Sequence, residues 1–157
     1  RRRRSRRSRL LYNDGVSKWR DGWYVVPYQV VFRDIDAYGH VNNVVYFAYF
    51  ETARILLWQE LTGKTGPLDL NFIVARAECD FRHQLGMEEI DICVRIGEMR
   101  TTSLDFLYEI RKDRGRELAA TGRVVVVLFD WETQAKVPIG DDFRRKVAAL
   151  GTGSREV

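Results

Sequence analysis

Two carboxylates, a glycine, a histidine and two asparagines stand close together in the segment DIDAYGHVNN, residues 34–43. This order is typical of a turn that bends at Gly39 and ends in an asparagine cap at the start of a helix. The first N–H groups of a helix have no acceptor within the helix and attract negative charge. A carboxylate beside such a free N–H supplies two parts of acyl transfer chemistry, a base or nucleophile and a donor to an oxyanion.

The flanking residues must position this segment. Residues 23–33, WYVVPYQVVFR, are rich in valine and aromatic side chains and predict a strand, which Pro27 restricts to a sheet edge or a bulge. Residues 44–61 contain no glycine or proline and are apolar on nearly every face over the first two turns. This pattern predicts a buried helix that ends at the glycines and proline of residues 63–67.

A period of two in the apolar residues predicts four more strands, at residues 72–83, 89–98, 103–110 and 118–131. The first three alternate apolar and polar residues, as half-buried antiparallel strands do, whereas the last contains VVVVLF and predicts burial on both faces. Residues 140–150, GDDFRRKVAAL, predict a short surface helix. The elements together predict an α+β fold in which one antiparallel sheet wraps around a single long helix.

Length and composition favour a single domain without metal or membrane. The chain has 157 residues, of which 45% are hydrophobic and 31% charged, and no run approaches the roughly 20 apolar residues of a membrane span. Cys79 and Cys93 lack metal-ligand spacing and lie in strand patterns, so we expect both to be reduced and structural. Reduced cysteines favour an intracellular protein, and we expect it to be cytoplasmic.

The net charge of +4 comes from one end of the chain, because seven of the first nine residues are arginine. Without these seven, 19 basic and 22 acidic residues leave a net charge of −3. We therefore predict a solvated basic tail at residues 1–20, one domain at residues 21–150 and a short tail at residues 151–157, with no nucleic-acid partner. An arginine-rich start without acids also resembles part of a transit peptide, which would place the protein in an organelle.

The motif DxDxxGHVNNxxYxxYFExAR, residues 34–54, resembles that of the hotdog-fold acyl-thioesterases, specifically the 4-hydroxybenzoyl-CoA thioesterase-like group of small acyl-CoA hydrolases. The resemblance covers about residues 24–147. It implies a hotdog fold and hydrolysis of an acyl-CoA to a free acid and CoA, with CoA as part of the substrate and no other cofactor. It also implies homodimers with two sites at the interface, often paired into homotetramers.

The resemblance also implies roles for individual residues. The second carboxylate of the motif, Asp36, is expected to act as the base or the nucleophile, although it could instead cap the turn. The backbone N–H of Asn43 is the expected oxyanion donor, with Asn42 as the helix cap that leaves this donor free. Tyr46 is the residue of the helix best placed to contact an acyl chain, and Arg82 is a candidate ligand for the CoA phosphates.

Three other titratable residues of the motif compete for roles. Asp34 is the second candidate carboxylate, which we interpret as a partner of the neighbouring arginine or as a loop residue. His40 could orient Asp36 or contact the acyl carbonyl, but a lone histidine in a turn is more often a scaffold residue. Glu51 is a rival base on the helix, yet it stands three residues before Arg54 and can pair with it.

Two other hotdog functions compete with acyl-CoA hydrolysis. The motif also resembles that of acyl-carrier-protein thioesterases, but those are tandem double hotdogs and this chain contains one. A non-catalytic hotdog that binds acyl-CoA is the other alternative. A hydratase is disfavoured, because its pattern places a histidine five residues after the aspartate, whereas His40 follows Asp36 by four.

Overall fold

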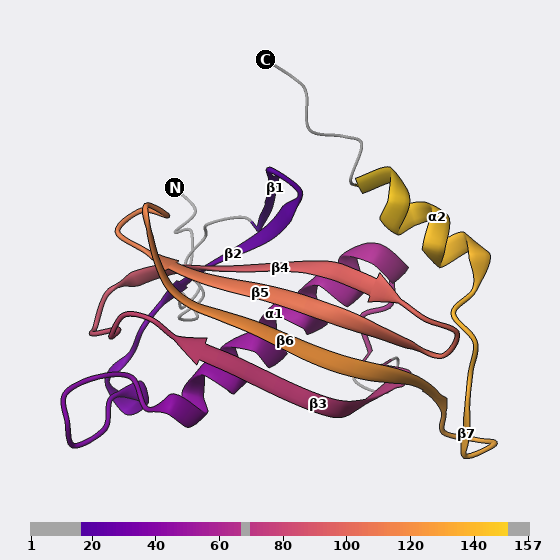
Figure 1. The fold of residues 1–157 in the computed structure, drawn as a ribbon, viewed down its shortest axis with the longest axis horizontal. Helices are drawn as coiled ribbons and strands as arrows, with labels where there is room; N and C mark the ends of the chain where they lie inside the picture. The colour runs from indigo at the N-terminus through magenta and orange to yellow at the C-terminus, as the bar shows by residue number, and fades with distance from the viewer. Residues whose placement is uncertain (1–16, 67–69, 151–157) are drawn as a thin grey trace, which may run out of the picture.

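The computed structural model describes residues 17–66 and 70–150, apart from the side chain of Lys18. The arginine-rich start, Pro67 and the predicted C-terminal tail therefore lie outside the described residues. A single antiparallel sheet dominates the fold, with strand order β1-β2-β4-β5-β6-β3 and β7 paired to β6 (Figure 1). The strands are β1 (Lys18–Arg20), β2 (Trp23–Gln29), β3 (Phe72–Phe81), β4 (Glu89–Met99), β5 (Ser103–Lys112), β6 (Glu117–Asp130) and β7 (Ala135–Lys136). The helices are the 3-10 turn η1 (Phe32–Asp34), α1 (Asn43–Thr62) and α2 (Asp141–Leu150).

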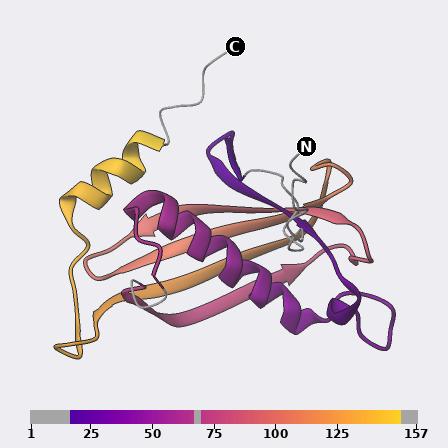
Figure 2. The ribbon, with the colours of Figure 1, turned by 180° about the vertical axis from the view of Figure 1, so that it is seen from behind.

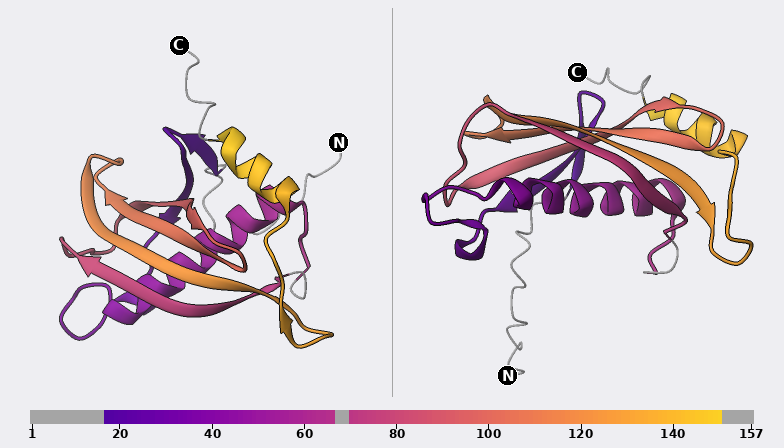
Figure 3. Two further views of the ribbon diagram at one scale, coloured as in Figure 1. Left: turned by 45° about the vertical axis from the view of Figure 1, so that its right-hand side comes forward. Right: turned by 60° about the horizontal axis from the view of Figure 1, so that its bottom comes forward.

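The long helix α1 lies across the concave face of the twisted sheet (Figures 2 and 3). Side chains from alternate positions of β4, β5 and β6 point towards it and form the core, as the period of two predicted. Gly122 of β6 permits close approach, because a Cβ at this position would overlap the ring of Phe50. Phe50 in turn stacks on Tyr108 of β5, with ring centroids 4.3 Å apart. The predicted α+β fold, one antiparallel sheet around one long helix, is confirmed.

The predicted ends of α1 are confirmed almost to the residue. The helix begins at Asn43 with Asn42 as its N-cap, and Gly63 in the left-handed conformation ends it. Its predicted burial on all sides is wrong, however, because Val44 and Glu51 are exposed. The sheet covers one side of the helix within this chain, so the apolar residues on the other side of its first turns remain accessible.

Two strands, β6 and β3, are more exposed than the sequence predicted. In β6, Val124 and Val126 are buried but Val125 and Val127 are only half-buried, so the prediction of burial on both faces is wrong. No described element covers the outer face of the sheet there. In β3, a bulge at residues 74–76 interrupts the pairing with β6, and most residues of the strand are exposed.

The remaining elements close the ends of the sheet. Residues 18–20, which the sequence placed in the N-terminal tail, form β1 and pair with β2. Pro27 is tolerated in β2 because β1 pairs only with residues 23–25, which leaves an open edge beside the proline. The predicted surface helix is α2, whose Phe143 packs against Trp58 of α1. No helix in the described ranges is long and apolar enough to cross a membrane.

Candidate active site

The loop between β2 and α1 carries most of the predicted site residues and is closed by backbone hydrogen bonds. The Asp36 N–H donates to the carbonyl of His40 at 3.0 Å, and the Gly39 N–H donates to the carbonyl of Asp36 at 3.0 Å. An isolated antiparallel bridge joins Ile35 to Val41 outside these two bonds. Gly39 has a φ of +82°, so the predicted bend at this glycine is confirmed.

Asp36 lies inside this tight turn, with a half-buried side chain. One carboxylate oxygen, Oδ1, accepts a hydrogen bond from the N–H of Tyr38 at 2.9 Å. The other oxygen, Oδ2, has no hydrogen-bond partner among residues 17–66 and 70–150. Asp36 therefore caps the turn through one oxygen, and this capping leaves the second oxygen available for chemistry.

The start of α1 leaves one backbone donor free, as the sequence predicted. The side-chain Oδ1 of Asn42 accepts from the Val44 N–H at 3.0 Å, and the carbonyl of Asn42 accepts from the Val45 N–H at 2.9 Å. The N–H of Asn43 makes no hydrogen bond within the described part of the chain. This exposed group stands at the positive end of a 20-residue helix. It is therefore suited to bind a carbonyl oxygen that becomes an oxyanion.

Asp34 lies in a different environment from the one expected. Its carboxylate is 5% exposed, and Oδ2 accepts hydrogen bonds from the hydroxyls of Tyr49 at 2.9 Å and Tyr28 at 3.3 Å. The expected partner Arg33 is only at the limit of an ion pair, 4.0 Å away, and its side chain is 87% exposed. The tyrosine contacts leave no signal in the sequence, because Tyr49 lies 15 residues away on another element.

A cavity of about 560 Å³ opens beside this buried carboxylate. It lies between η1 with its flanking residues and the first turns of α1. Its lining is mainly apolar and consists of Tyr28, Val31, Phe32, Arg33, Asp34, Val45, Ala48, Tyr49 and Thr52. After leaving β2, the loop that carries Asp36 therefore has open space on one of its sides.

His40 and Glu51 contribute less to the geometry of the turn. The carbonyl of His40 holds the Asp36 N–H, whereas its half-buried imidazole has no polar contact among the described residues. Glu51 pairs with Arg54 at 3.3 Å, as its spacing on the helix predicted. Arg54 is buried, whereas the carboxylate side chain of Glu51 is 62% exposed.

The two predicted substrate contacts lie in contrasting places. Tyr46 is buried against the edge of the Phe81 ring, with centroids 5.0 Å apart. Burial raises the pKa of Tyr46 to about 12, with smaller contributions from Cys79 and Glu88, so its hydroxyl remains a donor at neutral pH. Arg82 is exposed directly after β3, where its N–H donates to the carbonyl of Ala119.

Neither cysteine forms a disulfide, which agrees with the prediction of reduced thiols. Burial raises the pKa of Cys79 to about 11 and that of Cys93 to about 12, so both thiols stay protonated at neutral pH. Among the described residues, no group of three or more histidine, cysteine, aspartate or glutamate side chains could hold a metal ion.

Known proteins resemble this chain over most of its length. A profile of the thioesterase-like superfamily matches residues 30–147. The uncharacterized protein YsmA of Bacillus subtilis is 32% identical over 114 residues, which cover 72% of this chain and 77% of YsmA. A Thermus thermophilus thioesterase, solved in complex with coenzyme A and Zn, superposes with a TM-score of 0.71 at 31% identity, covering 87% of this chain and 97% of that one. A predicted thioesterase from Bacillus stearothermophilus gives a TM-score of 0.75 at 25% identity, covering 82% and 96%.

Proposed function

Because the profile match covers 118 residues, the chain belongs to the thioesterase-like superfamily, and we propose that it hydrolyses acyl-CoA thioesters to a free acid and CoA. One observation carries the proposal. A carboxylate with one free oxygen, Asp36, lies in the turn that leads into α1, and the first N–H of that helix, on Asn43, has no acceptor among the described residues. The Thermus relative bound to coenzyme A supports CoA as the carrier.

The proposed reaction begins at the thioester carbonyl. The free oxygen of Asp36 either attacks this carbon and forms a mixed anhydride, or takes a proton from a water molecule that attacks it. In both routes the carbonyl oxygen becomes an oxyanion, which the Asn43 N–H stabilises. The loss of one such donor typically costs about 3 kcal/mol of transition-state stabilisation.

Collapse of the tetrahedral intermediate expels the CoA thiolate. A thiolate is a better leaving group than an amine, so the reaction does not require a separate general acid beside Asp36. On the mixed-anhydride route, water then hydrolyses the anhydride to the free acid and the Asp36 carboxylate, and its second proton neutralises the thiolate. On the general-base route, Asp36 passes the proton that it took from water to the thiolate. Tyr46 is proposed to line the acyl groove, and Arg82 is proposed to bind CoA phosphate near the groove mouth.

We further infer that the working unit contains at least two copies of the chain. The apolar residues left open on α1 and the exposed strand β3 support this inference. An acyl chain needs a groove closed on both sides, and a second copy paired along β3 would supply the missing wall.

Hydrolysis of a panel of acyl-CoA thioesters by the wild type and by Asp36→Asn tests the proposal. The variant keeps the size of the side chain and can still accept from the Tyr38 N–H, but it is neither a base nor a nucleophile. We expect its kcat to fall by at least about 100-fold, with thermal unfolding unchanged. Asp142→Asn, an exposed carboxylate on α2, is the matched control and should retain the wild-type rate.

Each other outcome would assign this protein a different mechanism or function. Turnover by Asp36→Asn at the wild-type rate would remove Asp36 from the mechanism. A wild type that binds acyl-CoA without releasing free thiol would instead be an acyl-CoA-binding module. Faster hydrolysis of acyl-carrier-protein thioesters than of acyl-CoA would show that the substrate's carrier is the acyl carrier protein and not CoA.

A further inference from the structure

We propose that Asp34 is a positioning residue, whose buried carboxylate fixes the loop that brings Asp36 and the N–H of Asn43 to the same end of α1. This inference rests on the proposed thioesterase activity and adds a requirement to it. Asp34 touches neither the substrate nor the reacting atoms in this role. It acts through the two groups that do.

The carboxylate of Asp34 gathers donors from three parts of the chain. Its Oδ2 accepts from the Tyr28 hydroxyl on β2, the Tyr49 hydroxyl on α1 and the Val31 N–H before η1, at 3.3, 2.9 and 3.2 Å. The rings of Tyr28 and Tyr49 also contact each other, with centroids 4.9 Å apart. One oxygen atom therefore links the end of the strand, the 3-10 turn and the second turn of the helix.

The backbone of Asp34 connects this cluster to the reacting groups. Its carbonyl accepts from the Asn42 N–H at 2.9 Å, which holds the residue that caps α1. One residue further along, Ile35 forms the bridge to Val41 that closes the turn around Asp36. A shift of Asp34 would therefore move both sides of the turn and the first N–H of the helix.

Packing alone does not fix this part of the loop. The cavity of about 560 Å³ lies along η1 and the first turns of α1, so the loop lacks close neighbours on that side. The neighbouring side chain of Phe32 is 81% exposed and cannot anchor η1 in the core. On this open side of the loop, the hydrogen bonds to Asp34 supply the restraint that packing of Val30 and Val41 supplies on the core side.

The Tyr49 hydroxyl remains a donor over the whole physiological range of pH. Burial, followed by the hydrogen bond to Asp34, raises the pKa of the Tyr49 hydroxyl well above its ordinary value. The phenol consequently stays protonated and keeps its proton directed at the carboxylate. Tyr49→Phe removes this donor while preserving the ring, which makes it the mildest available change to the cluster.

The test compares Asp34→Asn and Tyr49→Phe with the wild type in two ways. In hydrolysis of a saturating acyl-CoA, we expect kcat to fall by about 100-fold for Asp34→Asn and by about tenfold for Tyr49→Phe, with KM little changed. In hydrogen–deuterium exchange, we expect faster exchange of the amides of residues 35–43 in both variants. This second measurement does not depend on activity.

Asp105→Asn is the matched control. Asp105 is buried to the same degree, at 4% exposed, and also accepts several hydrogen bonds, but it lies on β5 away from the loop. We expect this variant to lose stability while it keeps the wild-type kcat and the exchange rates of residues 35–43. A purely structural role for Asp34 would instead give both variants the same profile.

The outcomes separate the two proposals. A wild type without thioesterase activity would refute the proposed function, while exchange in the variants would still test whether Asp34 holds the loop. An active wild type whose Asp34→Asn variant retains its kcat and its exchange rates would refute the positioning role. If Asp34→Asn does not fold, an unchanged kcat and loop exchange in Tyr49→Phe would refute it equally.

Discussion

At the scale of single residues, three carboxylates lie at or near the start of α1, and their surroundings suit each to a different task. Asp34 is buried and saturated with donors on one oxygen, which suits it to hold structure. Asp36 is half-buried in the turn that leads into α1 and has a free oxygen, which suits it to react. Glu51 is exposed on the third turn of the helix and forms an ion pair with Arg54. Environment rather than residue type separates such roles.

Glu51→Gln tests the weakest of these three assignments, that Glu51 supports the helix and is not the base. Arg54 is nine-tenths buried, and its guanidinium has an ion pair with Glu51. Loss of the carboxylate would leave the buried charge without this partner, so we expect unfolding free energy to fall by about 1–2 kcal/mol. We expect kcat to stay close to that of the wild type, because Asp36 and the Asn43 N–H are untouched.

Urea denaturation and acyl-CoA hydrolysis of the same preparation check both halves of this expectation. Asp36→Asn is the reciprocal control, since it should lose activity and keep stability. If Glu51→Gln alone abolished turnover with an unchanged unfolding curve, the base would lie on the helix and Asp36 would only cap the turn.

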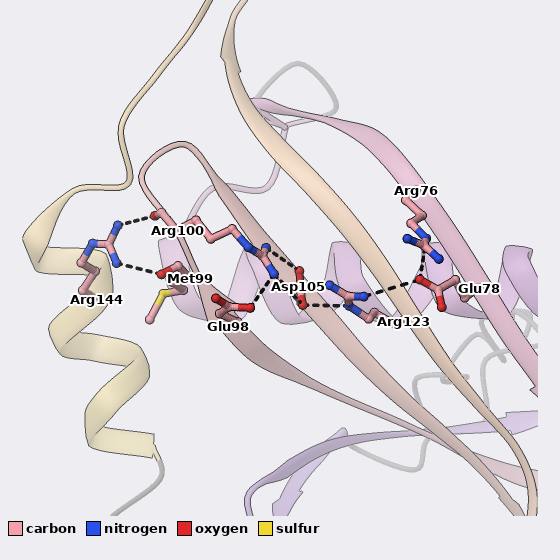
Figure 4. A network of polar contacts seen from close by, with 8 residues as sticks. All are labelled: Arg76, Glu78, Glu98, Met99, Arg100, Asp105, Arg123 and Arg144. Atoms are coloured by element: carbon pink, nitrogen blue, oxygen red, sulfur yellow. Dashed lines mark hydrogen bonds and ion pairs between the residues drawn. The ribbon is translucent and has the colours of Figure 1, made fainter.

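At the scale of elements, a row of charged residues crosses the outer face of the sheet and joins four of its segments (Figure 4). Its members come from β3, β6, β5 and the end of β4, and alternate in sign: Arg76, Glu78, Arg123, Asp105, Arg100 and Glu98. The central carboxylate, Asp105, is buried and accepts from Arg123 Nε at 2.8 Å and Arg100 Nη1 at 2.9 Å. Arg144 of α2 extends the row by donating to the carbonyls of Met99 and Arg100.

The row of charged residues predicts that the free energy of unfolding depends on pH in the acidic range. Burial alone would raise the pKa of Asp105, but hydrogen bonds from Arg100 and Arg123 outweigh it and hold the pKa below its ordinary value. A carboxyl with a lowered pKa in the folded state stabilises the protein above its unfolded pKa of about 4, and this contribution is lost as pH falls through the folded pKa. We expect Asp105→Asn to lose about 2 kcal/mol at pH 7 and the deficit to shrink below about pH 4.

Urea midpoints of the wild type and Asp105→Asn between pH 7 and pH 2.5 measure this deficit. Glu98→Gln is the control, because Glu98 pairs with the same Arg100 but is 67% exposed and should contribute at most about 1 kcal/mol. A deficit that stays constant from pH 7 to pH 2.5 would show that Asp105 acts through packing and not through its charge.

The elements were predictable from sequence where local chemistry decides them. The cap at Asn42, the bend at Gly39 and the end of α1 at Gly63 each depend on neighbours within a few residues. The contact between Asp34 and Tyr49 was missed, because it forms only once η1 has folded back against the second turn of α1. The three-residue strand β1 was missed because it is too short to show a period. Valines on both faces of β6 predicted two covered faces, but the described chain covers one.

At the scale of the whole molecule, the two edges of the sheet differ in their capacity to pair with another chain. One edge is β1, with only three residues, and short edge strands discourage pairing. The other is β3, with ten residues, which includes the exposed apolar side chains of Ile73, Val74 and Phe81. Figure 3 shows β3 at the border of the sheet. We therefore expect a second copy to bind along β3 and complete the groove.

Val74→Lys tests this arrangement in solution. Val74 is 49% exposed, so a lysine is tolerated in the free chain, but it would place an unpaired charge between two β3 strands. We expect the wild type to sediment as a dimer or larger, and the variant to dissociate at a concentration at least about tenfold higher, a loss of about 1.4 kcal/mol or more. The rate of acyl-CoA hydrolysis should fall in proportion to the dimer fraction, because the partner copy forms one side of the proposed acyl groove. Trp19→Lys, at the opposite edge, should keep both assembly and turnover. A wild type that is monomeric in sedimentation and fully active would show that one chain closes its own groove.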